Sequence, residues 1–383
     1  MQAISARRVL VGDSFVGPVT IEVHDGVIAE VRPGRTGGGR RDLDGGFLTA
    51  GLVDLQVNGC FGVDFAHATA DQWLTVSRRM ATTGVTGYLP TFITAPVSEL
   101  GVSLDRVSAA QRAQHRTVAQ ARILGAHLEG PFLSTVRAGT HDPSLMGDPG
   151  SAELASLLGT AQRRAALRMV TLAPERATAL EAIRRLADEG VLVSLGHTDA
   201  DGARGTEAAD AGARFVTHLF NAMPPLDHRR PTLAGRVLSD PRFRLGLIAD
   251  LHHVDADMLR MVLRLAPQRA VLVTDAVAAA GLPPGRYQLG GVEVATTVAD
   301  PLPRRADGVL AGSVLRLDQA VRNVAGLGIS PEHALLAATR NPADALARPD
   351  LGRVEPGALA DLVWWSDDLE VREVWVGGQP CLQ

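Results

Sequence analysis

Polar side chains interrupt six apolar segments of this 383-residue chain near the points where those segments end. Buried parallel strands are apolar almost throughout, so polar residues at their ends call for a reason. Any one of these polar residues could be an ordinary hydrogen-bonded residue of the core or of a loop. Six segments with polar residues at the same relative position favour a shared site. The interruptions are Asp54, Gln56, Asn58, Glu129, His197, His218, His253 and Asp275.

Glu129, His197 and His218 are the residue types of a catalytic metal centre with two imidazoles and one carboxylate. Such a centre leaves one coordination position for water. The three residues lie 68 and 21 positions apart, so no local motif joins them. Their convergence depends wholly on the fold.

Asp275 and His141 could carry out the proton and charge chemistry beside such a centre. A carboxylate at Asp275 can accept a proton from water and return it to a leaving group, or it can simply cap the next segment. His141, twelve residues after Glu129, can polarise a scissile carbonyl or merely order its turn. Five other histidines have no comparable context and are interpreted as ordinary residues: His24, His67, His115, His228 and His333.

Eight apolar runs between residues 50 and 350 alternate with segments of helical periodicity, which predicts a (β/α)8 barrel. In that fold the strand ends that carry the polar residues form the catalytic face. A doubly wound open sheet is the alternative, weakened because no G-x-G-x-x-G follows an early strand. The runs are 51–59, 85–94, 122–131, 167–175, 191–199, 213–223, 243–255 and 269–278.

Both ends of the chain consist of short β-branched and aromatic runs that are separated by Gly and Pro. This shared pattern predicts that the two ends form one small β-sandwich domain. We expect that domain to comprise residues 1–49 and 355–383, and the barrel to comprise residues 50–354.

Composition excludes several classes of function. All 38 basic residues are arginine, so chemistry that needs a lysine amine is excluded: Schiff bases, a pyridoxal phosphate anchor, a Walker P-loop and a carbamylated-lysine bridge. The net charge of -4 argues against nucleic acid or an anionic membrane as partner. Two cysteines, and no export signal or apolar span of 18 residues, favour the cytoplasm.

A set of segments occurs in a specific order from about residue 50 to 316: DLQVNGCFGVDF, HLEGPFLS, AGTHDP, SLGHTDA, THLFNAM, ADLHHVD, LVTDA and LAGS. In this combination the chain resembles the N-acetylglucosamine-6-phosphate deacetylases of the amidohydrolase superfamily. The C-terminal segment GRVEPGALADLVWW also resembles the strands of that superfamily's β-sandwich. The resemblance implies removal of the acetyl group from N-acetylglucosamine 6-phosphate, in amino-sugar catabolism or cell-wall recycling.

The resemblance also implies roles for individual residues. Glu129, His197 and His218 match the ligands of one divalent metal ion, with Zn²⁺ expected and Fe²⁺ or Mn²⁺ as alternatives, and Asp275 and His141 match catalytic residues. The family's phosphate-binding arginine and the histidine like His253 come from the neighbouring subunit, which implies a homodimer with a shared active site. The implied substrate-binding residues are Thr140, Asn221, Ala222, Arg229 (or its neighbour Arg230), His253, Leu310, Ala311 and Gly312.

The chain departs from many amidohydrolases at the end of its first barrel strand. Gln56 and Asn58 stand where a His-x-His pair would bind a second metal ion, and amides ligate such cations poorly. We therefore expect a single metal ion in each chain. Two other functions stay open: a deacetylase of another N-acetyl-hexosamine phosphate, and a barrel that binds a sugar phosphate without catalysis.

Overall fold

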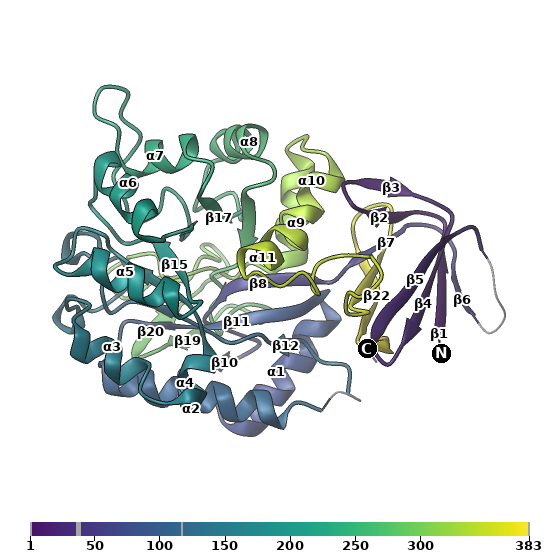
Figure 1. The fold of residues 1–383 in the computed structure, drawn as a ribbon, viewed down its shortest axis with the longest axis horizontal. Coiled ribbons are helices and arrows are strands. Elements are labelled where there is room, and N and C mark those ends of the chain that lie inside the picture. The colour runs from purple at the N-terminus through teal and green to yellow at the C-terminus, as the bar shows by residue number, and fades with distance from the viewer. Residues whose placement is uncertain (1, 36–39, 116–117, 382–383) are drawn as a thin grey trace.

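Eight parallel strands form the centre of the molecule (Figure 1). The computed structural model describes residues 2–35, 40–115 and 118–381. Each strand pairs in parallel with the next along the chain, apart from the short β12 (Arg122–Ile123) that joins the edge of β11. The predicted (β/α)8 barrel is confirmed. Its strands are β8 (Leu52–Val57), β11 (Val85–Ile93), β13 (Ala126–Glu129), β14 (Leu167–Leu172), β15 (Leu192–Leu195), β16 (Phe215–Val216), β17 (Arg244–Ile248) and β18 (Ala270–Val273).

The barrel closes where the end of β8 meets the end of β18. The backbone N–H of Asp275 donates to the carbonyl oxygen of Gln56 at 2.8 Å. Below this bond, the buried carboxylate of Asp54 accepts a hydrogen bond from the Thr274 hydroxyl at 2.6 Å and another from the Thr274 backbone N–H at 3.3 Å. These bonds join the first and last barrel strands and turn the sheet into a nearly closed cylinder.

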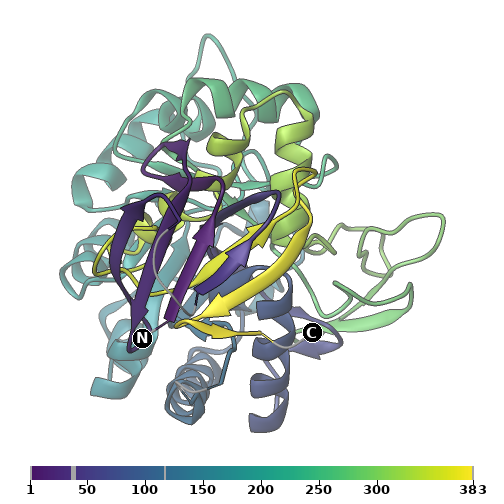
Figure 2. The same cartoon turned by 90° about the vertical axis from the view of Figure 1, so that its right-hand side faces the viewer.

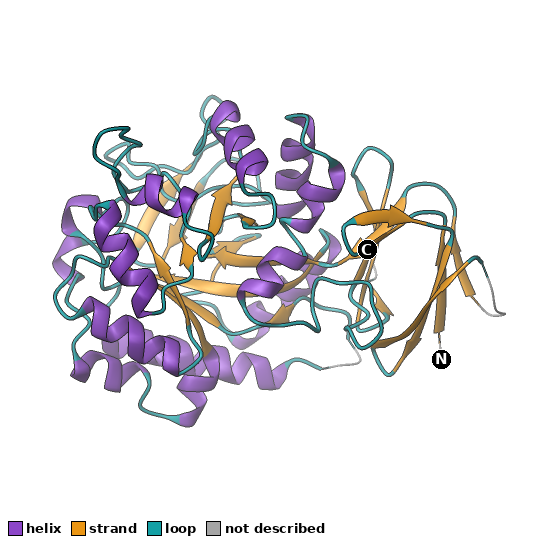
Figure 3. Cartoon of the chain, turned by 45° about the horizontal axis from the view of Figure 1, so that its top comes forward, coloured by secondary structure: helices purple, strands orange, loops and turns teal. Residues whose placement is uncertain are grey.

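Helices cover the outside of the barrel (Figure 3). In α5 the buried residues Ala179, Ala182, Ile183 and Leu186 follow a spacing of three and four, so one stripe of the helix faces the strands. Three of the segments with helical periodicity in the sequence, residues 71–84, 177–190 and 256–267, correspond to α1, α5 and α8. The helices are α1 (Ala70–Thr82), α2 (Val97–Ala113), α3 (Ser151–Leu157), α4 (Ala161–Ala166), α5 (Ala179–Asp188), α6 (Gly202–Ala211), α7 (Leu233–Ser239), α8 (Ala256–Leu265), α9 (Leu317–Gly326), α10 (Pro331–Leu336) and α11 (Arg340–Ala345). Within the described ranges, none of these helices has the length and apolar character needed to cross a bilayer.

The two ends of the chain build two further sheets beside the barrel (Figure 2). One has the order β5 (Val27–Pro33), β4 (Val19–His24), β1 (Gln2–Ala6) and β6 (Arg40–Leu43). The other has the order β23 (Gln379–Pro380), β22 (Val371–Val376), β21 (Leu362–Trp365), β7 (Phe47–Ala50), β2 (Val9–Val11) and β3 (Ser14–Val16).

A separate apolar core packs these terminal sheets together. Ile4, Ile21 and Ile28 belong to it, with Leu362 and Trp375 from the other end of the chain. The two ends therefore depend on each other for burial, as their similar composition predicted. The domain boundaries at 49/50 and 354/355 stay predictions.

Two small hairpins complete the described structure. The first pairs β9 (Gly59–Cys60) with β10 (Val63–Asp64), and the second pairs β19 (Arg286–Leu289) with β20 (Val292–Ala295). The second hairpin has a small apolar core of its own, which contains Val277, Leu289, Val294 and Ala311. Ile93, the last residue of β11, packs against this core, so the hairpin lies at a strand end of the barrel.

We expect the bond between Arg122 and Asp361 to stabilise the joint between the barrel and the terminal sheets. Asp361 is buried beside β21, and it accepts hydrogen bonds from Arg122 at 3.0 and 3.1 Å and from the Gly377 N–H at 2.6 Å. Asp361→Asn should lower the free energy of unfolding by about 1.5–3 kcal/mol, measured by urea denaturation, because it weakens charge-assisted hydrogen bonds. Asp367→Asn is the matched control, since that exposed carboxylate lies 3.6 Å from Arg8 and should contribute little. Equal effects of the two changes would contradict this view of the joint.

Candidate active site

The C-terminal ends of the barrel strands surround a cavity of about 160 Å³. Glu129 is the last residue of β13, and His197 and His218 each follow their strands, β15 and β16, by two residues. Asp275 has the same position after β18. All four line the cavity together with His141, which lies on the loop after β13. The barrel thus brings these residues together although 146 positions separate Glu129 from Asp275.

Three of these residues have an unusual backbone conformation. The φ angles of His197, His218 and Asp275 are 47°, 28° and 49°, in the left-handed region that residues with a side chain rarely adopt. Such strain persists only where the surrounding structure enforces it, and it clusters at functional sites. The backbone itself therefore supports a site at these strand ends.

One carboxylate oxygen and two imidazole nitrogens meet at the floor of the cavity. Nε2 of His218 lies 3.0 Å from Oε1 of Glu129, Nε2 of His197 lies 3.3 Å from the same oxygen, and the two nitrogens are 3.1 Å apart. Ligand atoms arranged tetrahedrally at about 2.0–2.1 Å from a zinc ion lie about 3.3 Å from one another. Both the residue types and their spacing therefore fit one divalent metal ion.

The surroundings of His197 and Glu129 prepare them for this role. Nδ1 of His197 donates to the backbone carbonyl of Arg137 at 2.9 Å, so its Nε2 carries the free lone pair that a metal needs. Burial disfavours the charged form of Glu129, but the two imidazoles that face it, His197 and His218, outweigh burial and hold its pKa well below the usual value. Glu129 is therefore an anion at neutral pH.

Gln56 connects the two buried carboxylates of the site, and Asn58 contacts one of them. The side-chain amide of Gln56 donates to Glu129 and to Asp275, each at 3.2 Å, and that of Asn58 donates to Asp275 at 2.7 Å. The carboxylate partners fix both orientations, because an amide oxygen facing a carboxylate would be repelled. Both residues interrupt an apolar run in the sequence, but nothing in that run indicates that Gln56 bridges the two acids.

Burial and neighbouring groups change the pKa values of Asp275 and His141. Burial, together with the negative charge of Glu129, raises the pKa of Asp275 to about 6. Burial and the nearby His197 lower the pKa of His141 to about 3, so this ring is neutral. A carboxylate with a pKa near neutrality suits both acceptance and return of a proton.

His141 also approaches the ligand atoms. Its ring centre lies 4.4 Å from that of His197, and its ligand atom falls within 4.8 Å of those of Glu129 and His197. Two sets of three ligands are therefore available by distance alone, one with His218 and one with His141. The hydrogen bonds to His141 decide between them, as described below.

The structure places most of the other sequence-predicted residues at the cavity. Ala311 is buried behind the wall, in the small core of the β19–β20 hairpin. His253 lines the cavity of its own chain, whereas the resemblance implied that a neighbouring subunit supplies it. Arg229 and Arg230 are exposed on the loop before α7 and are absent from the described cavity wall. The predicted residues that do line it are Thr140, Asn221, Ala222, His253, Leu310 and Gly312.

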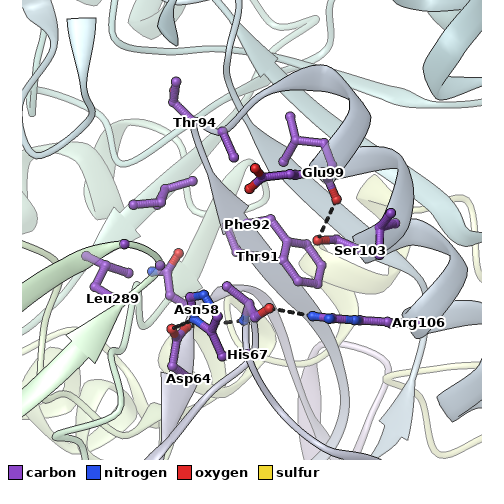
Figure 4. Close-up of a pocket in the computed structure, with 17 residues that line it drawn as sticks. Asn58, Asp64, His67, Thr91, Phe92, Thr94, Glu99, Ser103, Arg106 and Leu289 are labelled. Atoms are coloured by element: carbon purple, nitrogen blue, oxygen red, sulfur yellow. Dashed lines mark hydrogen bonds and ion pairs between the residues drawn. The ribbon is translucent and has the colours of Figure 1, made fainter. Parts of the chain in front are cut away.

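A second cavity of about 330 Å³ adjoins the first between the β9–β10 hairpin and α2 (Figure 4). Asn58, Ile93 and Leu289 line both cavities and form the wall between them. Sequence reasoning missed Ile93 and Leu289, because apolar residues at strand and hairpin ends carry no chemical signal. Thr94 lies at the edge of the second cavity and follows the end of β11.

Comparison with known proteins identifies the family. The amidohydrolase family model matches residues 47–381. The chain belongs to the amidohydrolase family. This amidohydrolase is 39% identical over 378 residues to an N-acetylgalactosamine-6-phosphate deacetylase of Escherichia coli O157:H7, with 98% of both chains covered. It is also 39% identical over 352 residues to the human N-acetylglucosamine-6-phosphate deacetylase, covering 89% of this chain and 84% of the other.

A solved structure of the family has the same fold as this amidohydrolase. It is a mutant of N-acetyl-D-glucosamine-6-phosphate deacetylase from Mycobacterium smegmatis in complex with N-acetyl-D-glucosamine-6-phosphate. The TM-score is 0.92 at 34% sequence identity, and the match covers 100% of this chain and 99% of the other.

We expect the purified amidohydrolase to hold one tightly bound divalent metal ion per chain. Gln56 and Asn58 direct their N–H groups at carboxylates and do not provide the imidazoles of a second site. Elemental analysis of fully active protein should give close to one equivalent, and His218→Asn should reduce it. Two retained ions that are both required for turnover would contradict this expectation.

Proposed function

We propose that this amidohydrolase removes the acetyl group from N-acetyl-D-glucosamine 6-phosphate and releases D-glucosamine 6-phosphate and acetate. The observation that carries the proposal is the convergence of Glu129, His197 and His218 with Asp275 and His141 in one cavity. Two imidazoles, a carboxylate metal ligand, a second carboxylate and a neutral histidine are the components of a hydrolytic amide-cleaving site. The relatives reported above support the choice of substrate.

We also propose Zn²⁺ as the metal, held by Glu129, His197 and His218. A zinc ion bound there would lower the pKa of a water molecule and polarise the amide carbonyl. Glu129 supplies the negative charge, and the hydrogen bond from His197 to the carbonyl of Arg137 keeps its ring oriented. The cytoplasm is the proposed location, supported by Cys60 and Cys381, which are both free thiols.

Asp275 carries the proton through the reaction. Its carboxylate takes a proton as the water oxygen forms a bond with the acetyl carbon, while Nε2–H of His141 donates to the carbonyl oxygen, where negative charge develops. The C–N bond then breaks, and Asp275 returns its proton to the departing nitrogen. Gln56 and Asn58 hold the Asp275 carboxylate in place throughout.

The phosphate needs a cation that the described cavity does not contain. None of the residues that line the cavity in the described part of the chain is an arginine, although a phosphate dianion is normally paired with one. We propose that a second copy of the chain supplies Arg229 or Arg230 across a homodimer interface. The exposed side chains of Leu226 and Leu251, 42% and 40% accessible, support such an interface beside these arginines and His253.

N-acetyl-D-galactosamine 6-phosphate is the second candidate substrate. The E. coli relative that covers 98% of this chain bears that name. The two sugars differ only in the configuration of one ring hydroxyl, so the metal site and the chemistry would be identical.

A panel of substrates tests the function. We expect acetate release from N-acetylglucosamine 6-phosphate, less from the galactosamine epimer, and least from the unphosphorylated sugar. Asp275→Asn should lower turnover by about 10²–10⁴-fold because the proton acceptor is lost, while the metal content stays near native. A higher kcat/KM for the epimer would favour the second candidate. No acetate from any substrate would leave a barrel that only binds sugar phosphates.

Mixed dimers test the shared site. A chain with both Arg229→Ala and Arg230→Ala should lose about 1.5–3 kcal/mol of transition-state stabilisation on the phosphorylated substrate and little on the unphosphorylated sugar. Co-expression of this chain with an Asp275→Asn chain should restore about one quarter of native activity, since half of randomly formed dimers are mixed and each contains one complete site. Failure to restore activity would show that the arginine acts within its own chain or not at all.

A further inference from the structure

Thr94 forms two contacts with the side chain of His141. It directly follows β11, is 6% exposed and lines the second cavity (Figure 4). Its backbone N–H donates to Nδ1 of His141 at 3.2 Å, and its hydroxyl oxygen lies 2.8 Å from the same nitrogen. Two groups of one residue therefore contact one ring nitrogen of His141.

These contacts determine which nitrogen of His141 carries the proton. A backbone N–H can only donate, so Nδ1 must offer its lone pair. In a neutral imidazole the other nitrogen, Nε2, then carries the hydrogen. With Nδ1 engaged and Nε2 protonated, His141 has no free lone pair for a metal ion. Of the two ligand sets that distance allows, only the one with His218 remains.

Gly130 makes this approach of Thr94 possible. It follows the metal-ligand candidate Glu129 and has a φ of 99°. A Cβ atom at Gly130 would lie 2.2 Å from the Thr94 hydroxyl oxygen, which is far inside van der Waals contact. The turn that delivers Glu129 to the cavity therefore also leaves the space in which the Thr94 hydroxyl reaches His141.

We infer that Thr94 is a positioning residue that fixes His141 as an Nε2–H donor to the substrate carbonyl and prevents it from binding the metal. The inference rests on the proposed amide hydrolysis for the donor role, while the tautomer and the exclusion from the metal follow from the hydrogen bonds alone. Both hydrogen-bonding contacts of Thr94 described above reach Nδ1 of His141. The effect of Thr94 on the reaction passes entirely through His141.

A double-mutant cycle tests the inference on the metal-loaded enzyme. Thr94→Val keeps the side-chain shape and the backbone N–H but removes the hydroxyl, so we expect kcat to fall about tenfold or more with little change in KM. Thr94→Ser should restore kcat, because it returns the hydroxyl. In a His141→Asn background, Thr94→Val should cause no further loss. Additive losses from the two changes would overturn the inference, as would a Thr94→Ser variant as slow as Thr94→Val.

Two measurements that do not depend on turnover separate this inference from the proposed function. Nitrogen-15 NMR of histidine-labelled protein, with the His141→Asn variant to assign the signal, should show His141 protonated on Nε2. Metal analysis should give near-native content for His141→Asn and a reduced content for His218→Asn. An Nδ1–H tautomer, or loss of the metal in His141→Asn, would overturn the inference even if the substrate is hydrolysed. If no substrate on the panel is hydrolysed, these two results still decide how His141 is held.

Discussion

Closure of the barrel between β8 and β18 is the constraint on which the site depends. Side chains at the ends of eight strands point at a common centre only if the first strand returns to the last. Here the join consists of a backbone bond between Gln56 and Asp275 and the buried contact of Asp54 with Thr274. The same join places the Gln56 and Asn58 amides against the Asp275 carboxylate. The contacts that close the barrel therefore also fix the position of the Asp275 carboxylate.

Two buried carboxylates, Glu129 and Asp275, face the same cavity. Glu129 and Asp275 are both nearly inaccessible, and two carboxylates in a medium of low dielectric destabilise each other strongly. Gln56 shares its N–H groups between them, and two imidazoles face Glu129. A divalent cation bound beside Glu129 would complete the compensation. The shared amide also links the electrostatic state of Glu129 to that of Asp275.

The sequence predicted the barrel and the residues gathered at its mouth, because both leave periodic or compositional signals. Apolar runs alternate with helices, and polar residues such as Glu129 and His218 break those runs where strands end. The contact between Thr94 and His141 leaves no such signal in the sequence. It joins positions 47 residues apart, and its donor is a backbone N–H, which every residue except proline carries. Ile93 also lines the cavity, but an apolar residue inside an apolar run does not stand out in the sequence. Contacts of this kind depend on loop geometry, which no periodic pattern encodes.

The pairing of β7 with β21 has a consequence for how this chain folds as it is synthesised. Phe47–Ala50 lies beside Leu362–Trp365 in one antiparallel ladder, so a strand made early is completed by one made near the end. One edge of β7 pairs with β2, which is made earlier, but during translation its other edge has no native partner until residues 362–365 have been made. Non-local pairing of this type slows folding and leaves an unpaired strand edge exposed meanwhile. The barrel, whose neighbouring strands follow one another along the chain, can form from contacts that are far more local.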